Sequence, residues 1–81
     1  MNNYERVKSF LEERFLIEFG GDINDDTDLF KAGVIESKGY MNIIKFIKSD
    51  LGIEMTDDDI FLNVFTSLSN IMDFVNLKIN N

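Results

Sequence analysis

The sequence of 81 residues contains no cysteine, no histidine and no proline. The lack of cysteine excludes a disulfide framework and a thiolate metal site, which fits a cytosolic protein. The lack of histidine removes the commonest general base and the commonest transition-metal ligand. No Ser-His-Asp, Cys-His, P-loop or Rossmann signature occurs either. These absences predict a protein that is not an enzyme.

Long apolar runs and an excess of basic residues are also missing. No stretch has the length of a membrane-spanning helix, and residues 1–8 lack the layout of a signal peptide. Eight Lys and Arg residues against fifteen Asp and Glu residues give a net charge of −7, which argues against generic binding to nucleic acid. We therefore expect a cytoplasmic monomer that has neither nucleic acid nor membrane as a partner.

The length and the apolar content favour one small folded domain. Residues 1–81 leave room for one modest core, and a hydrophobic fraction of 44% argues against disorder. The spacing of apolar residues by three and four predicts a first amphipathic helix over residues 4–19, ended by Gly20 and Gly21. A long loop rich in Asp and Asn follows over residues 22–35.

Three further helices are predicted after this loop. The second begins at Glu36 or Ser37 and runs to Leu51, with a buried stripe that repeats every three or four residues. Thr56 is expected to cap a short third helix, and Thr66 is expected to cap the last one. The prediction is an all-α fold, a small four-helix bundle with a long loop between its first two helices.

Two acidic clusters resemble metal sites only in part. Residues 22–28 alternate oxygen ligands at the spacing of an EF-hand, but Thr27 stands where the loop needs glycine. Gly33 stands where that loop needs a bidentate glutamate. The run at residues 57–59 is explained more simply as a charged first turn of a helix. The sequence therefore predicts no metal site.

The most informative segment covers residues 28–44. A loop with apolar anchors turns at Gly33 and delivers Ser37 to the start of an amphipathic helix. From the serine alone, an N-cap role is the simpler interpretation.

The same segment resembles the family of acyl carrier and peptidyl carrier proteins. The motif of that family has a Leu-Phe-like pair and then Gly-x-x-[Asp/Glu]-Ser at the start of helix two; Leu29, Phe30, Gly33, Glu36 and Ser37 occupy these places. Residues 51–55, Leu-Gly-Ile-Glu-Met, are similar to the family's exit from helix two. Residues 63–68 are similar to the start of its last helix, so the resemblance covers nearly the whole chain.

The resemblance implies a fold of acyl-carrier-protein type with 4′-phosphopantetheine esterified to Ser37, beside Glu36. A separate phosphopantetheinyl transferase would supply the arm from coenzyme A, and the terminal thiol would hold an acyl or aminoacyl group as a thioester. The implied partners are that transferase, a loading enzyme and a downstream synthase or transferase. Polyketide, nonribosomal peptide or related lipid biosynthesis is the expected setting. A D-alanyl or fatty-acyl cargo and an interaction module without the arm are the alternatives.

The chain departs from the family on its second helix. The residue after the serine is Lys38, where the family has an apolar residue, and Lys45 and Lys48 stand on a helix that is typically acidic. Together with Met41 these lysines follow helical spacing along one exposed stripe, which we predict to bind partners. The expected partner presents carboxylates, or a neutral apolar groove that admits Met41.

Overall fold

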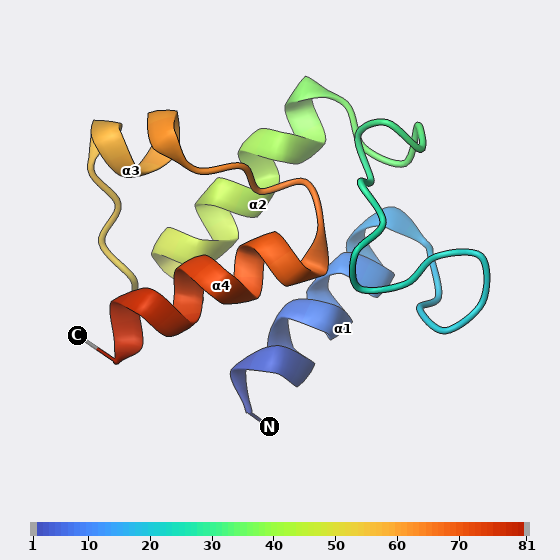
Figure 1. The fold of residues 1–81 in the computed structure, drawn as a ribbon, viewed down its shortest axis with the longest axis horizontal. Helices are drawn as coiled ribbons and strands as arrows, with labels where there is room; N and C mark the ends of the chain where they lie inside the picture. The colour runs from blue at the N-terminus through green and yellow to red at the C-terminus, as the bar shows by residue number, and fades with distance from the viewer. Residues whose placement is uncertain (1, 81) are drawn as a thin grey trace.

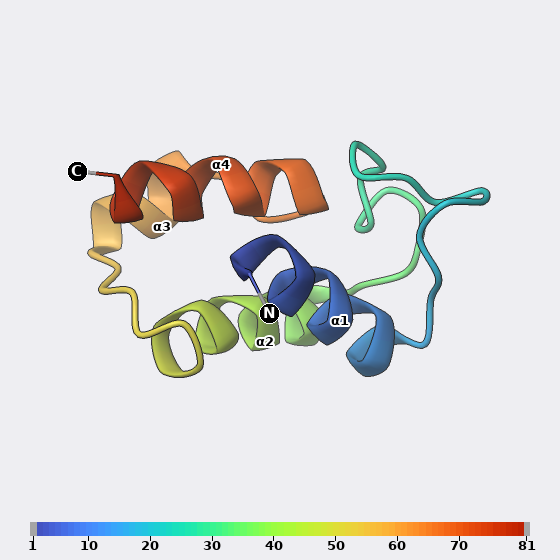
Figure 2. The same cartoon turned by 90° about the horizontal axis from the view of Figure 1, so that it is seen from below.

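The computed structural model describes residues 2–80, which form four helices and no strands (Figure 1). The helices are α1 (Asn3–Phe15), α2 (Ser37–Ser49), α3 (Asp57–Leu62) and α4 (Leu68–Ile79). Seen from below, α3 and α4 form one layer and α1 and α2 form the other (Figure 2). The predicted all-α class with four helices is confirmed for this part of the chain.

One cluster of apolar side chains joins the two layers. Three of the four helices and the connecting segments contribute to it, whereas α3 buries none of its residues. The buried members are Val7, Leu11, Leu29, Ile35, Ile43, Ile44, Phe46, Ile47, Ile53, Phe65, Leu68, Ile71, Phe74 and Val75. Burial of such side chains is the main favourable contribution to folding, so the position of α2 is fixed by four of its own core residues.

Helix α1 ends earlier than the sequence predicts. It stops at Phe15, and Leu16 adopts the left-handed conformation with φ 57°. The backbone N–H of Ile17 then donates to the carbonyl of Glu12 at 3.2 Å, which closes the helix as a left-handed cap does. The predicted end at Gly20 and Gly21 is therefore wrong, because a leucine takes the conformation that glycine usually supplies.

Replacing Leu16 by glycine is expected to stabilise the protein. A non-glycine residue in the left-handed region costs about 1 kcal/mol, and Leu16 is 90% exposed, so little packing is lost with its side chain. We expect a net gain of about 0.5–1 kcal/mol in the free energy of unfolding, measured by urea denaturation, after the extra entropy of an unfolded glycine. Leu16→Ala keeps the backbone strain and should bring no gain; a gain equal to that of Leu16→Gly would contradict this explanation.

Two other boundaries differ from the prediction. Helix α2 begins at Ser37 as expected but ends at Ser49, two residues before the predicted Leu51. The cap of α4 is Ser67, whose hydroxyl accepts the N–H of Asn70 at 3.1 Å, so the predicted cap at Thr66 is wrong. The backbone carbonyl of Thr66 accepts a bond from the loop instead, and its side chain is buried.

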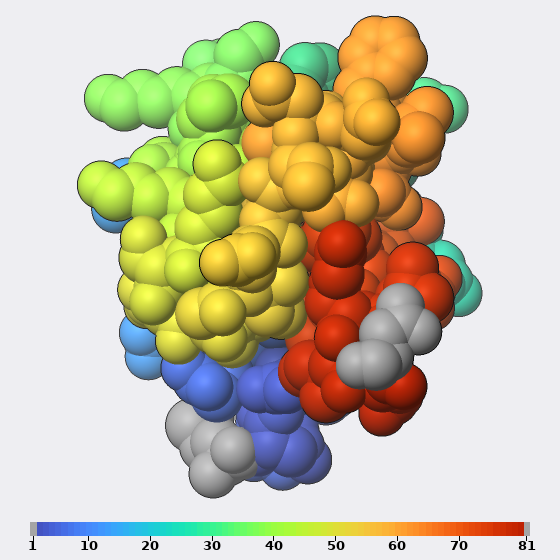
Figure 3. Space-filling model, turned by 90° about the vertical axis from the view of Figure 1, so that its left-hand side faces the viewer, coloured from blue at the N-terminus to red at the C-terminus, as the bar shows by residue number. Residues whose placement is uncertain are grey.

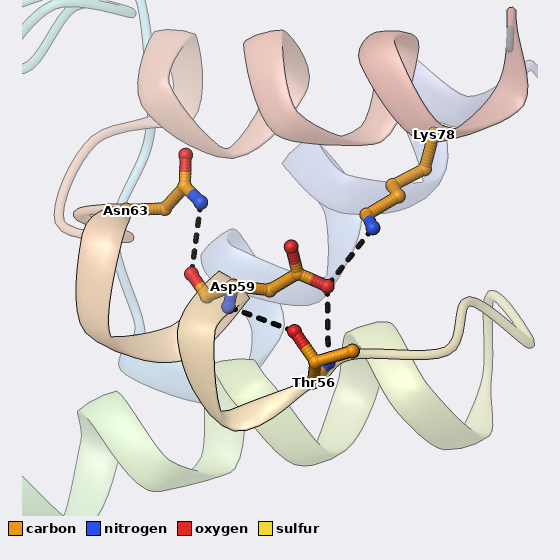
Figure 4. Close-up of polar contacts among 4 residues, drawn as sticks. All are labelled: Thr56, Asp59, Asn63 and Lys78. Carbon is orange, nitrogen blue, oxygen red and sulfur yellow. Dashed lines mark hydrogen bonds and ion pairs between the residues drawn. The ribbon is translucent and has the colours of Figure 1, made fainter.

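Helix α3 begins with the predicted cap at Thr56. The Thr56 hydroxyl accepts the N–H of Asp59 at 3.0 Å, and the Asp59 carboxylate accepts the N–H of Thr56 at 3.0 Å (Figure 4). This capping box is joined to α4 by an ion pair of 2.9 Å between Asp59 and Lys78. The carbonyl of Asp59 accepts a bond from Asn63 at 2.8 Å at the other end of the helix. Since α3 has no fully buried side chain and contributes to the core through the half-buried Ile60, these polar contacts add much of what holds it in place.

We expect the protein to lose stability in acid through this capping box. The N–H bond from Thr56, and next the contact with Lys78, lowers the pKa of Asp59. The folded-state pKa is thus below the unfolded value of about 3.9, so this contribution to stability is present above that value and is lost as pH falls through the folded-state pKa. Between about pH 5 and pH 2, the midpoint temperature of thermal unfolding should decrease less for Asp59→Asn than for the wild type. Asp57→Asn keeps both contacts of Asp59, so its unfolding midpoint should fall with pH as the midpoint of the wild type does. If the midpoints of all three proteins fell equally with pH, this role of Asp59 would be excluded.

The acidic loop before α2 uses its polar side chains to join the helices. The hydroxyl of Tyr4 donates to the carboxylate of Asp25 at 2.7 Å, which raises the pKa of Tyr4. The hydroxyl of Ser69 donates to Asp26 at 2.6 Å, and the N–H of Asp26 donates to Asn24 at 2.9 Å. Within residues 2–80, no group of three or more acidic side chains is placed to hold a metal ion.

Candidate functional site

A hydrogen-bonded turn positions the start of α2. The carboxylate of Asp28 accepts the N–H groups of Phe30 and Lys31, each at 3.0 Å. The bond from Lys31 is the main reason that the pKa of Asp28 is lowered. The carbonyl of Leu29 accepts the N–H groups of Val34 and Ile35 at 2.9 and 3.1 Å. The chain is thereby folded back on itself directly before Ser37.

The turn is also attached to the core and to the start of α4. Leu29 and Ile35 are buried, and the N–H of Leu29 donates to the carbonyl of Thr66 at 2.7 Å. Gly33 has φ 78°, a conformation that side-chain-bearing residues rarely adopt. The positions of the family motif thus have physical roles here, since Leu29 anchors the turn and Gly33 permits it.

Ser37 lies at the first helical position of α2 and is exposed. Its hydroxyl has no hydrogen-bond partner among residues 2–80 and therefore does not cap the helix. The N-cap is Glu36, which is exposed and makes no side-chain capping bond. The simpler interpretation from the sequence, Ser37 as an N-cap, is not what the structure shows.

The start of α2 differs from the starts of the other helices. Asn2, Thr56 and Ser67 each accept an N–H bond from the first turn of α1, α3 and α4, respectively. The first turn of α2 has neither such a bond nor an acidic residue. Its N–H groups, which no side chain caps, and the positive end of the helix dipole can therefore stabilise an anion at this position.

Gly39 allows the end of α1 to pack against the first turn of α2. A Cβ atom at this position would lie 2.9 Å from Cε1 of Phe15 and 3.2 Å from Cβ of Ile35. Both distances are shorter than ordinary van der Waals contact, so a larger residue would displace one of these neighbours. Gly39 therefore helps to fix how α2 presents Ser37.

The predicted partner-binding residues share one face of α2. Lys38, Lys45 and Lys48 are exposed, and Met41 is 61% exposed. At 1.5 Å per residue, the face extends for about 15 Å from Lys38 to Lys48. Long side chains of α2 project from the left edge of the molecule in Figure 3, away from α4. The structure thus places Glu36, Ser37 and Lys38 together, and the other three residues follow along the helix.

Sequence reasoning missed the residues that fix the position of Ser37. The sequence favours local turns made by Asx side chains in the loop over residues 22–28, and Asp28 makes such a turn, but nothing in the sequence shows that this turn positions Ser37. The bond from Leu29 to Thr66 joins residues 37 positions apart and has no local signal. The contact between Gly39 and Phe15 likewise depends on how two helices pack.

Comparisons with protein-family models, with curated proteins and with solved structures give no match to this chain. No helix in the range 2–80 combines the length and the apolar character needed to cross a bilayer.

Proposed function

We propose that the chain is a freestanding carrier protein that holds acyl or aminoacyl intermediates as thioesters on a 4′-phosphopantetheine arm attached to Ser37. It acts in the cytoplasm, in polyketide, nonribosomal peptide or related lipid biosynthesis. It has no catalytic residues of its own. Its partners are a phosphopantetheinyl transferase, a loading enzyme and a downstream synthase or transferase.

The observation that carries the proposal is the exposed and unbonded hydroxyl of Ser37 at an uncapped helix start. A transferase can reach this oxygen without breaking a structural bond. The uncapped N–H groups of the first turn would stabilise the phosphodiester, and Lys38 adds a positive charge nearby. The bound arm supplies the thiol chemistry, whereas the protein supplies attachment and recognition.

The helix arrangement gives a second line of support. Four helices with a long connection between α1 and α2 agree with a fold of acyl-carrier-protein type. Along the exposed face of α2, Lys38, Met41, Lys45 and Lys48 are the proposed contacts for partner enzymes. Their position beside Ser37 lets an enzyme hold this face while it acts on the arm.

Incubation with coenzyme A and a broad-specificity phosphopantetheinyl transferase tests the proposal. Intact-protein mass spectrometry should show the addition of one phosphopantetheine, and fragmentation should locate it on Ser37. The absence of modification by each of several transferases would favour the second candidate, an interaction module without the arm. That candidate is supported by Lys38, which stands where carrier proteins present an apolar residue to their enzymes.

A further inference from the structure

The exposed face of α2 carries positive charge that the fold does not neutralise. Three of the eight basic residues of the chain, Lys38, Lys45 and Lys48, lie on it, although the net charge is −7. None of the three lies within 4.0 Å of a carboxylate in residues 2–80, where the ion pair found joins Lys78 to Asp59. At 100° per residue the three lysines and Met41 occupy an arc of about 80°. We name this arc the lysine face.

Folding alone does not explain all of this charge. Lys48 lies in the last turn of α2, where a cation stabilises the helix dipole. Lys38 lies in the first turn, where the same dipole disfavours a cation. Lys45 has no ion-pair partner within residues 2–80 either, so neither an ion pair nor the helix dipole accounts for Lys38 and Lys45.

A groove between α1 and α2 extends the lysine face. The rings of Phe10 and Phe46 stack at 4.1 Å between their centres and line a groove of about 210 Å³. Arg14 from α1 and Lys45 from α2 line the same groove. Asp50 lines it too, and its carbonyl accepts a bond from Arg6 at 2.7 Å. With the Asp50 carboxylate counted against Arg14 and Lys45, the lining keeps a net charge of +1. Two cations beside an apolar surface suit a carboxylate at the end of an aliphatic chain, such as a glutamate.

We infer that the lysine face and this groove bind an acidic, amphipathic segment of a partner protein. Carboxylates of the segment meet Lys38, Lys45 and Lys48, an apolar side chain covers Met41, and one carboxylate enters the groove between Arg14 and Lys45. The acidic loops elsewhere on the chain repel such a segment, so the lysine face is favoured as its contact. The bound segment then ends beside Ser37.

The inference deepens the proposed function, on which it rests for the identity of the partner as an enzyme that acts at Ser37. It differs from the family pattern in the sign of the charge, because carrier proteins usually present an acidic helix to basic enzymes. The surface itself can be tested without the arm. If Ser37 is modified but the surface does not bind, the carrier role stands and the acidic partner is excluded.

The experiment uses a synthetic helical peptide with glutamate and leucine on one face, titrated into the isotope-labelled protein. At low ionic strength, amide shifts should concentrate on α2 and on the end of α1 around Arg14. A rise in salt from about 0.02 M to 0.2 M should weaken binding, because the Debye length shortens. The matching peptide with lysine in place of glutamate should not shift these amides.

Charge reversals locate the contact. Lys45→Glu and Arg14→Glu should each weaken peptide binding by about fivefold or more at low salt. Lys8→Glu is the control, because Lys8 lies on the side of α1 opposite Phe10. This variant should change the affinity by less than about twofold. Circular dichroism confirms that each variant is folded. Equal losses for all three variants, or shifts outside α2 and the end of α1, would overturn the inference.

Discussion

Ser37→Ala is expected to abolish the addition of phosphopantetheine completely, because it removes the only oxygen to which the proposed arm is attached. The change should leave the fold intact. Since the Ser37 hydroxyl caps nothing, its loss should alter the free energy of unfolding by less than about 0.5 kcal/mol. Mass spectrometry after treatment with transferase and coenzyme A measures the first effect, and urea denaturation measures the second.

Ser49→Ala is the matched control for this variant. Ser49 is also an exposed serine of α2, but it lies at the opposite end of the helix. This variant should accept one phosphopantetheine as the wild type does. Modification of Ser37→Ala would place the arm on another residue, and loss of modification in Ser49→Ala would mean that the transferase depends on the whole helix.

The largest loss of stability is expected from Phe65→Ala. Phe65 is fully buried, packs edge-on against Phe74 with 5.1 Å between ring centres, and lies 6.2 Å from the ring of Tyr40. It thereby joins α2 to α4. Truncation of such a side chain removes buried apolar area and leaves a cavity, which together cost about 3–5 kcal/mol.

This loss is large for a small domain, whose total stability is about 5–15 kcal/mol. Urea denaturation followed by circular dichroism should show a much lower midpoint for Phe65→Ala. Phe61→Ala is the control, because Phe61 is 86% exposed on α3 and should change stability by less than about 0.5 kcal/mol. Similar losses for the two variants would contradict the assigned core.

The sequence predicts the helices and their buried faces well because those signals are local. Of the stripe predicted for the second helix, Ile43, Ile44 and Ile47 are buried, whereas Tyr40 and Leu51 are half-buried. Thr56 is followed by acids and caps α3 as expected. Periodicity and capping depend on residues a few positions apart, so one chain is enough to read them.

The helix boundaries that the sequence predicts wrongly depend on contacts between residues distant in sequence or on the backbone conformation of single residues. Nothing in the sequence marks Leu16 as a left-handed residue. Thr66 and Ser67 can both cap a helix, and Ser is the better cap by type. The bond from Leu29 to the Thr66 carbonyl accompanies the choice of Ser67.

In the candidate site, too, the features with a local sequence signal are predicted and those that depend on distant contacts are not. Ser37 and the lysines are visible in the sequence, because they follow a motif and a helical repeat. The groove with Arg14 is not, since it exists only where Phe10 of α1 stacks on Phe46 of α2. The free hydroxyl of Ser37 also needs the structure, because sequence alone leaves it as a possible cap.

The most direct test of the carrier role is the mass of the protein isolated from the cells that produce it naturally. After digestion, the peptide that contains Ser37 should carry one phosphopantetheine in at least part of the population, with or without a thioester-linked group. Peptides that contain the other serines should have their unmodified masses. A Ser37 peptide that is wholly unmodified, in cells whose other carrier proteins bear the arm, would contradict the proposed function.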